Sequence, residues 1–319
     1  MTRFLLFSSA LAWLLCPAGS ASAAELHKQT HVYKQVGDTK IKADVYRPAD
    51  KKKRPVLVWI HGGALITGSR EGVSGRLRRL AADEGYVLVS IDYRLAPQAK
   101  IKEIISDLRD ALQWIREKGP ELFGADTSRL VVSGGSAGGY LTMMAGTLEP
   151  RPKALVTYWG YGSLDAKWYT QPSEHYRKVV PLIDKDTAWA GVGKSVVTGA
   201  SGDAGRQRGR FYLYCRQNGL WTRTVTGFDP AKERDKITPF CPVRNITKDY
   251  PPIVMIHGTA DTDVPFEESA NMAFELQKHG VRHELLTVPE GGHGLGGGDR
   301  RMIEWAHERA LQFIREQLR

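Results

Sequence analysis

The chain has 319 residues, of which 42% are hydrophobic and 25% are charged, and its formal net charge at pH 7 is +10. This is ordinary globular composition, with enough apolar residues for one large core or two small ones. The lysines and arginines are scattered along the chain and no nucleic-acid-binding motif accompanies them, so we expect no nucleic-acid partner.

The first 23 residues have the three parts of a secretory signal peptide. A short basic segment at residues 2–3 precedes an apolar run at 4–15, and residues 21–23 (Ala-Ser-Ala) resemble a cleavage site. The apolar run is too short for a membrane-spanning helix, which needs about 20 residues, and no other stretch is long enough. We therefore expect a mature chain over 24–319, a secreted or periplasmic location and no stable insertion into a membrane.

After this segment, the apolar pattern alternates between strands and helices. Residues 30–36 and 40–46 flank a Gly-Asp turn and predict an antiparallel hairpin. Continuous apolar runs predict buried strands, and apolar residues at helical spacing predict helices. The expected strands are 56–60, 86–91, 130–132, 154–158, 253–257 and 283–288, and the expected helices are 77–84, 101–118, 140–145, 267–279 and 300–318. The alternation predicts an α/β fold with a mostly parallel central sheet and helices on both faces.

Residues 159–252 interrupt this alternation. A parallel crossover needs only about a dozen residues, whereas this segment is far longer and is rich in Trp, Tyr, Gly and Pro. We expect it to form a packed cap inserted into the catalytic domain, and the alternative is a separate domain. Trp168 and Tyr169 are candidates for lining a substrate pocket, although packing inside the cap is the alternative role for most of its aromatic residues.

Residues 134–138, Gly-Gly-Ser-Ala-Gly, match the pattern G-x-S-x-G between a predicted strand and a predicted helix. In that context the serine sits in a strained turn, which requires small neighbours. Its Oγ would project above the sheet, and the helix N-terminus behind it would favour developing negative charge. The pattern predicts Ser136 as a nucleophile. The alternative is a glycine-rich turn with an incidental serine.

A second glycine-rich loop follows the predicted strand 56–60 and reads His-Gly-Gly-Ala. Acyl transfer develops an oxyanion, which needs backbone N–H donors close to it. Small residues after a central strand let the backbone approach, so we expect the N–H groups of Gly63, Ala64 and Ala137 to form the oxyanion hole. His61 is expected to brace this loop.

An acid and a base follow the last two predicted strands. Ligands bind at the carboxyl ends of strands in such sheets, and Asp261 and His293 both lie in loops after strands. Asp261 is expected to orient the imidazole of His293, and Asp263 is the competing candidate for that role. The alternative for the Asp-x-Asp pair is a cation site, but no full metal-binding loop follows, so we expect no metal.

Two cysteines, Cys215 and Cys241, lie beyond the predicted signal peptide. In an oxidising compartment they would form a disulfide, and the alternative is two buried free thiols.

The chain resembles the α/β-hydrolases of the esterase/lipase superfamily. Residues 61–64, 92–97 (Asp-Tyr-Arg-Leu-Ala-Pro) and 134–138 are similar to carboxylesterases of the hormone-sensitive-lipase type and to bacterial feruloyl-esterase-like enzymes. The segment 257–265 and its spacing to His293 look more like the catalytic domains of prolyl-oligopeptidase-type peptidases. The chain departs from these groups because Ala64 replaces the third glycine of many lipase-like members. The residues before the first buried strand are also too few for the propeller of the peptidases.

This resemblance implies a serine hydrolase that cleaves small-molecule carboxylic esters through a Ser136–His293–Asp261 triad and an acyl-enzyme, with no cofactor. One alternative is a peptidase or amidase that uses the same triad. Another is a non-catalytic binding protein that uses the aromatic cap as its surface. The sequence predicts neither the acyl group nor the oligomeric state.

Overall fold

The computed structural model describes residues 25–50 and 52–319, so the predicted signal peptide lies outside the described residues. Within the described residues, eight strands form one sheet in the order β1-β2-β4-β3-β5-β6-β7-β8. Their bounds are β1 His27–Val36, β2 Thr39–Arg47, β3 Arg54–Ile60, β4 Val87–Ile91, β5 Ala125–Gly135, β6 Ala154–Tyr158, β7 Ile253–Gly258 and β8 His283–Val288.

The sheet is mostly parallel, as predicted. β1 and β2 form the antiparallel hairpin, β2 also pairs antiparallel with β4, and the pairs from β4 through β3 to β8 are parallel. β3 lies between β4 and β5, so the loop after β3 emerges beside the turn after β5. This neighbourhood brings the His-Gly-Gly-Ala loop next to Ser136.

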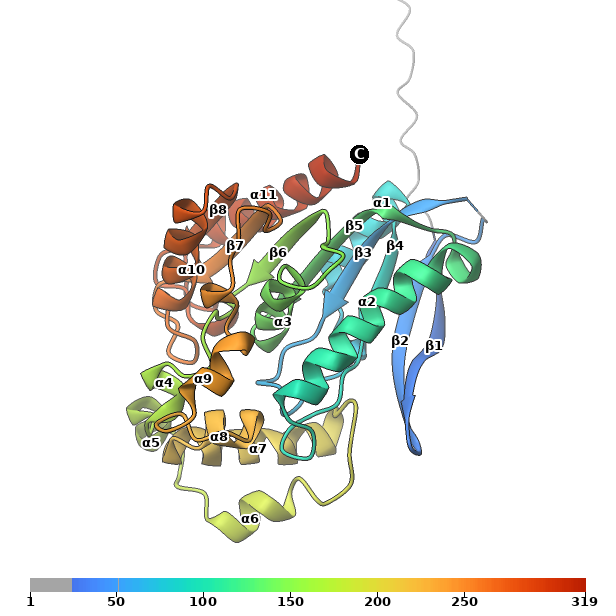
Figure 1. Ribbon diagram of the computed structural model, residues 1–319. Helices are drawn as coiled ribbons and strands as arrows, with labels where there is room; N and C mark the ends of the chain where they lie inside the picture. Colours follow the sequence, from blue (N-terminus) through green and yellow to red (C-terminus); the bar gives the residue numbers. More distant parts are fainter. Residues whose placement is uncertain (1–24, 51) are drawn as a thin grey trace, which may run out of the picture.

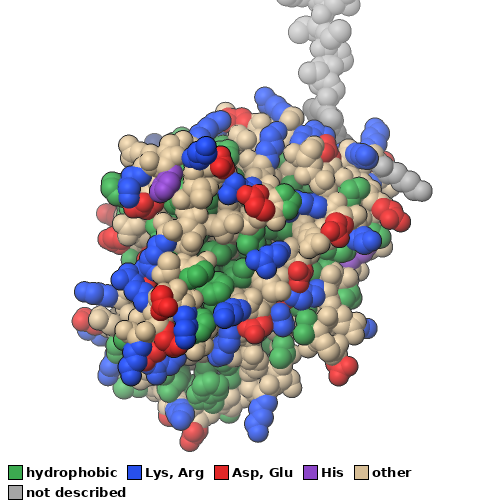
Figure 2. Space-filling model, in the orientation of Figure 1, with side chains coloured by type: hydrophobic (Ala, Val, Ile, Leu, Met, Phe, Trp, Pro, Cys, Tyr) green, Lys and Arg blue, Asp and Glu red, His purple; other side chains and the backbone are tan. Residues whose placement is uncertain are grey.

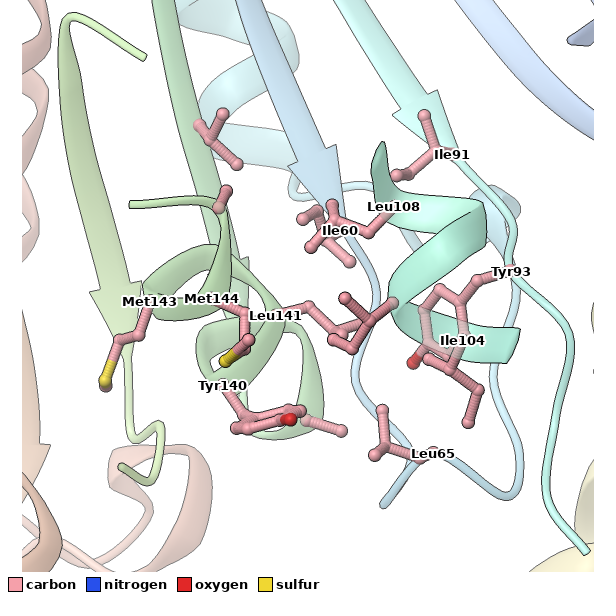
Figure 3. Packing of buried hydrophobic residues seen from close by; sticks show 14 of the residues in the cluster. Ile60, Leu65, Ile91, Tyr93, Ile104, Leu108, Tyr140, Leu141, Met143 and Met144 are labelled. Carbon is pink, nitrogen blue, oxygen red and sulfur yellow. The ribbon is translucent and has the colours of Figure 1, made fainter. Parts of the chain in front are cut away.

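Helices cover both faces of the sheet (Figure 1). Side chains of a strand alternate between faces, and β3 illustrates this: Val58 and Ile60 belong to one buried cluster, and Leu57 and Trp59 belong to the other. The first cluster includes residues of α2, α3 and α10, and Figure 3 shows Ile60 facing Leu108 and Leu141 within it. The second cluster includes residues of α1 and α11. These helices are α1 Gly75–Glu84, α2 Ile101–Phe123, α3 Ala137–Ala145, α10 Glu267–Lys278 and α11 Arg300–Leu318.

α2 is longer than predicted, because it continues through Gly119 and Pro120. A Cβ on Gly119 would lie 2.8 Å from the ring of Phe123, so the glycine makes room for a fully buried side chain that anchors the last turn. The helix ends at Gly124, whose φ of 65° is the left-handed conformation common after helices.

The segment 159–252 contains helices that lie next to the carboxyl ends of the strands (Figure 1). Its buried residues, among them Tyr161, Phe211 and Trp221, belong to the same apolar cluster as α2 and α3. Shared packing therefore joins this segment to the sheet domain. Its helices are α4 Lys167–Thr170, α5 Glu174–Val179, α6 Lys185–Ala190, α7 Gly202–Asn218, α8 Trp221–Thr226 and α9 Arg234–Ile237.

The predicted disulfide is wrong, because Cys215 and Cys241 are both buried free thiols. Cys215 Sγ lies 3.7 Å from Thr224 Oγ1, and Cys241 Sγ accepts a hydrogen bond of 3.4 Å from the N–H of Leu164. Burial raises the pKa of Cys215 to about 12 and that of Cys241 to about 11, so both remain protonated at neutral pH.

Charged side chains of both signs are interspersed on the face seen in Figure 2. Among the described helices, none combines the length and the apolar character that crossing a membrane would require.

Candidate active site

Ser136 lies in the turn between β5 and α3, with φ 54° and ψ −122°. The turn is tight because of its glycines: a Cβ on Gly134 would come 2.4 Å from the carbonyl oxygen of Gly138, and a Cβ on Gly138 would come 2.0 Å from that of Ile60. Side chains larger than hydrogen cannot occupy these two positions without displacing the backbone. The G-x-S-x-G pattern therefore has a steric cause in this fold.

The structure brings Ser136, His293 and Asp261 together. His293 Nε2 lies 3.1 Å from Ser136 Oγ, and His293 Nδ1 lies 2.8 Å from Asp261 Oδ2. The other oxygen, Asp261 Oδ1, accepts hydrogen bonds of 2.9 Å from the N–H groups of Asp263 and Val264. These backbone donors fix the carboxylate, which in turn fixes the imidazole ring.

Local electrostatics keep Asp261 ionised. Burial opposes the charge, but hydrogen bonds with His257 and His293 outweigh it and hold the pKa of Asp261 below its usual value. A carboxylate only accepts hydrogen bonds, so His293 Nδ1 carries the proton and Nε2 is left to accept from the Ser136 hydroxyl. Burial lowers the pKa of His293, but the hydrogen bond with Asp261 and the charges of Asp263 and Asp261 raise it above its usual value.

His257 braces the loop that carries the acid. Its Nδ1 lies 2.7 Å from Ser269 Oγ, and its Nε2 lies 3.0 Å from the carbonyl oxygen of Val264 and 3.3 Å from Asp261 Oδ2. The side chain is fully buried at the end of β7.

Asp263, the competing candidate, lies on the other side of the imidazole. Its Oδ2 is 3.6 Å from His293 Nε2, so it cannot orient the ring through Nδ1. Its Oδ1 accepts hydrogen bonds from Arg216 Nη1, at 2.5 Å, and from the hydroxyl of Tyr212. The Arg216 guanidinium is almost fully buried and lies over the rings of Trp168, Tyr169, Tyr176 and Tyr212, at 5.1–5.7 Å from their centroids.

Sequence reasoning missed Arg216 and Tyr212. The available signal was the spacing of Arg208, Tyr212 and Arg216, four residues apart, which places all three on one stripe of α7.

The His-Gly-Gly-Ala loop lies against the nucleophile, since a Cβ on Gly62 would come 3.2 Å from Ser136 Cβ. His61 Nδ1 lies 2.7 Å from the carbonyl oxygen of Gly62, as expected of a bracing residue. The carbonyl oxygen of Gly63 accepts from the N–H groups of Ile66 and Thr67, both at 2.9 Å. In a trans peptide the N–H points away from the C=O of the same plane, so these bonds fix the direction of the next N–H, that of Ala64.

Three amides near Ser136 are free to bind an oxyanion. Within the described residues, the N–H groups of Gly63 and Ala64 have no hydrogen-bond acceptor. Ala137 is the first residue of α3, where an N–H has no acceptor inside the helix.

The structure places the two predicted pocket residues in the packing of the cap. Trp168 Nε1 donates a hydrogen bond of 2.9 Å to Glu268 Oε1, and the buried ring of Tyr169 stacks on Trp221 with centroids 3.6 Å apart. Trp159, which sequence reasoning did not single out, is closer to the chemistry: its half-buried ring meets the edge of the His293 ring with centroids 6.2 Å apart. A pocket-lining role for Trp168 and Tyr169 stays a prediction.

Over the described part of the chain, no three His, Cys, Asp or Glu side chains gather as a potential metal site. The carboxylates of Asp261 and Asp263 are directed to different partners, His293 Nδ1 for the first and Arg216 and Tyr212 for the second.

Comparison with known proteins gives a family and a fold. The family model described as BD-FAE matches residues 43–276. Non-reducing polyketide synthase adrD of Penicillium rubens is 27% identical over 337 aligned positions, which cover 91% of this chain and 14% of that protein. The chain thus spans about one seventh of that relative, and it covers between 13% and 15% of seven further non-reducing polyketide synthases.

Two solved structures match almost the whole chain. A Staphylococcus aureus protein of unknown function superposes with a TM-score of 0.72 at 20% identity, over 92% of this chain and 100% of that chain. An esterase of Pyrobaculum calidifontis superposes with a TM-score of 0.63 at 24% identity, over 92% of this chain and 85% of that chain. At these identities the likeness shows a shared fold, which is the α/β-hydrolase fold.

Proposed function

The chain belongs to the BD-FAE family of α/β-hydrolases, and from this premise we propose that it is a serine esterase that cleaves carboxylic esters through an acyl-enzyme. The observation that carries the proposal is the unbroken series of contacts from Ser136 Oγ through His293 to Asp261, at 3.1 and 2.8 Å. A nucleophile, a base and an orienting acid at these separations are the arrangement that activates a serine hydroxyl.

In the first half of the reaction, His293 Nε2 takes the proton from Ser136 Oγ as the oxygen attacks the ester carbonyl. The N–H groups of Gly63, Ala64 and Ala137 stabilise the oxyanion of the tetrahedral intermediate. The intermediate collapses when the alkoxide leaves with the proton from His293, and the acyl group stays on Ser136.

In the second half, water takes the place of the alcohol. His293 Nε2 removes a proton from the water, which attacks the acyl carbonyl, and the same amides again stabilise the oxyanion. Collapse returns the proton to Ser136 Oγ and releases the carboxylic acid. Asp261 stays ionised throughout and stabilises the imidazolium in each half.

The test compares two serines of the same strand and turn. Ser136→Ala should lower kcat for a short p-nitrophenyl ester by at least about a thousand-fold, by analogy with other triad deletions. Ser133→Ala, which removes a buried hydroxyl three residues earlier in β5, should leave kcat within a few fold. Near-full activity in Ser136→Ala would refute the esterase mechanism.

The two alternatives have their own readouts. Faster turnover of an aminoacyl anilide than of the aryl ester would favour a peptidase or amidase that uses the same residues. Failure of Ser136 to react with a fluorophosphonate probe would favour a non-catalytic binding protein.

We also propose that residues 1–23 are removed on export to the periplasm or the medium. N-terminal sequencing of the exported protein should begin near residue 24, and recovery of the full-length chain from the cytoplasm alone would contradict the proposal.

A further inference from the structure

The cap makes direct contacts with the loop that carries two of the oxyanion donors, residues 61–68, which we call the oxyanion loop. Trp221 Nε1, in α8, donates a hydrogen bond of 2.9 Å to the carbonyl oxygen of Ala64. Arg208 Nε, in α7, donates one of 2.5 Å to the carbonyl oxygen of Ile66. Gly68 and Ala200 exchange two backbone hydrogen bonds of 3.0 and 2.8 Å. The cap thus contacts the backbone of the loop at three residues, Ala64, Ile66 and Gly68.

Arg208 is an unusual side chain in this position. It is 3% exposed, yet its hydrogen bonds go to neutral oxygens: the carbonyls of Ile66, Ala96 and Val192 and the amide oxygen of Gln98. Burial lowers its pKa to about 10, so the guanidinium stays charged at neutral pH. A buried cation is stable only with well-formed hydrogen bonds. The guanidinium group is planar, so it also fixes the relative positions of the groups that it binds.

The oxyanion loop needs such support, because two of its non-glycine residues have left-handed backbone conformations. Ala64 has φ 55° and Leu65 has φ 62°, and L-residues adopt this region only where the surroundings hold them there. On the side of the sheet domain, the Leu65 side chain enters the apolar cluster with Tyr93 and Ile104 (Figure 3). On the side of the cap, Trp221 holds the carbonyl of Ala64 and Arg208 holds that of Ile66.

Because the loop is held from both sides, we propose that the cap shapes the oxyanion hole, and that Arg208 and Trp221 are positioning residues for the reaction. The proposal rests on the esterase function of Ser136. It gives the cap a role in the rate of the chemical step, in addition to any role in selecting the acyl group.

Each carbonyl shares a rigid peptide plane with the N–H of the next residue. Trp221 fixes the plane of the Ala64–Leu65 peptide, which adjoins the peptide that carries the Ala64 N–H. Arg208 fixes the plane of the Ile66–Thr67 peptide, whose N–H donates to the carbonyl oxygen of Gly63, and that carbonyl shares its plane with the Ala64 N–H. When one of these donors is lost, the neighbouring planes can turn and the Ala64 N–H leaves the position from which it binds the oxyanion. The oxyanion exists only in the transition state and the tetrahedral intermediate, so kcat should fall while KM changes little.

The variants are Arg208→Met and Trp221→Phe, which remove the donors and keep most of the apolar volume. Gln217→Met is the matched control, because Gln217 is also a buried residue of α7 and its Nε2 donates to three backbone carbonyls, those of Tyr176, Val180 and Pro181, all inside the cap. Arg208→Lys keeps the charge and can still reach one carbonyl. Thermal unfolding verifies that each variant is folded.

The first readout is kcat and KM on p-nitrophenyl butyrate. We expect Arg208→Met and Trp221→Phe to lower kcat by about 10- to 100-fold with KM within about threefold of wild type. Arg208→Lys should recover part of the loss, and Gln217→Met should keep kcat within a few fold.

The second readout compares two ketone inhibitors with the same carbon skeleton, of which only one readily forms an oxyanion with the serine. An alkyl trifluoromethyl ketone forms a hemiketal oxyanion with Ser136, whereas the matching methyl ketone binds mainly without reacting. The two variants should weaken the first inhibitor by about 10- to 100-fold and the second by less than threefold.

Wild-type kcat in a folded Arg208→Met or Trp221→Phe protein, or an equal loss for both inhibitors, would overturn the proposal. If Arg208→Met does not fold, the kcat and inhibitor measurements on Arg208→Lys and Trp221→Phe decide the proposal instead. A wild-type protein without Ser136-dependent hydrolysis would instead refute the esterase function, and the positioning role would fall with it.

Discussion

Asp263 Oδ2 lies 3.6 Å from His293 Nε2, the same nitrogen that faces Ser136 Oγ. The charge of Asp263 is one of the causes that raise the pKa of His293. A base must be unprotonated to accept the serine proton, so kcat/KM should fall as the pH drops through this raised pKa. Asp263 therefore affects the acid limb of the kcat/KM profile, the pH range in which activity falls as His293 becomes protonated, without contacting His293 Nδ1.

The first prediction is that Asp263→Asn shifts the acid limb of the kcat/KM profile to lower pH. Loss of the carboxylate removes a stabiliser of the imidazolium, so His293 stays neutral to a lower pH. Asp165→Asn is the control, because Asp165 also pairs with arginines of this region, Arg234 and Arg244, away from His293. An unchanged acid limb in Asp263→Asn would mean that Asp263 does not act on the base.

The second prediction has the opposite sign. Arg216 lowers the pKa of His293 through its charge, and it pairs with Asp263 at 2.5 Å. Arg216→Met should therefore move the acid limb to higher pH, because Asp263 then acts on His293 without its counter-ion. The same variant should lower the free energy of unfolding by about 3–5 kcal/mol, since it leaves a carboxylate unpaired in a mostly buried site. A shift of the acid limb to lower pH would show that the Arg216–Asp263 pair does not control the pKa of His293.

The sequence predicted the parts of the site that depend on local patterns. Apolar runs located the strands, and the glycines at 62, 63, 134, 135 and 138 marked the loops at their carboxyl ends, which parallel pairing brings to one edge of the sheet. Contacts between distant segments had no such pattern. Arg208 and Ile66 are 142 residues apart in the chain, and no periodicity links them.

The errors have the same origin. The disulfide was inferred from compartment and number of cysteines, but pairing depends on proximity, and Cys215 and Cys241 each have other neighbours in the cap. The predicted helix 101–118 ended just before Gly119-Pro120, but burial of Phe123 outweighs the local helix-breaking tendency of these two residues.

The third prediction follows from the free thiols. The exported protein, unfolded without reductant, should react with two equivalents of a thiol reagent, one each at Cys215 and Cys241. A reductant should leave the midpoint of thermal unfolding unchanged, because no covalent cross-link is lost. Detection of no free thiol, together with a midpoint that falls on reduction, would establish a disulfide instead.

The last prediction concerns the glycine that closes the turn of the nucleophile. A Cβ at position 138 would lie 2.0 Å from the carbonyl oxygen of Ile60, so Gly138→Ala must push β3 away from α3 or open the turn. We expect it to destabilise the fold by roughly 1–3 kcal/mol and to lower kcat by at least about 100-fold, because Ser136 moves relative to His293.

Gly209→Ala is the control: position 209 lies inside α7 with no atom within 4 Å of the added Cβ. An alanine there should leave kcat unchanged and raise the free energy of unfolding by up to about 1 kcal/mol, since alanine is the better helix former. Denaturant unfolding and ester kinetics of the two variants separate the steric effect from a general cost of replacing glycine. Equal changes in kcat and in the free energy of unfolding for both variants would refute the steric effect.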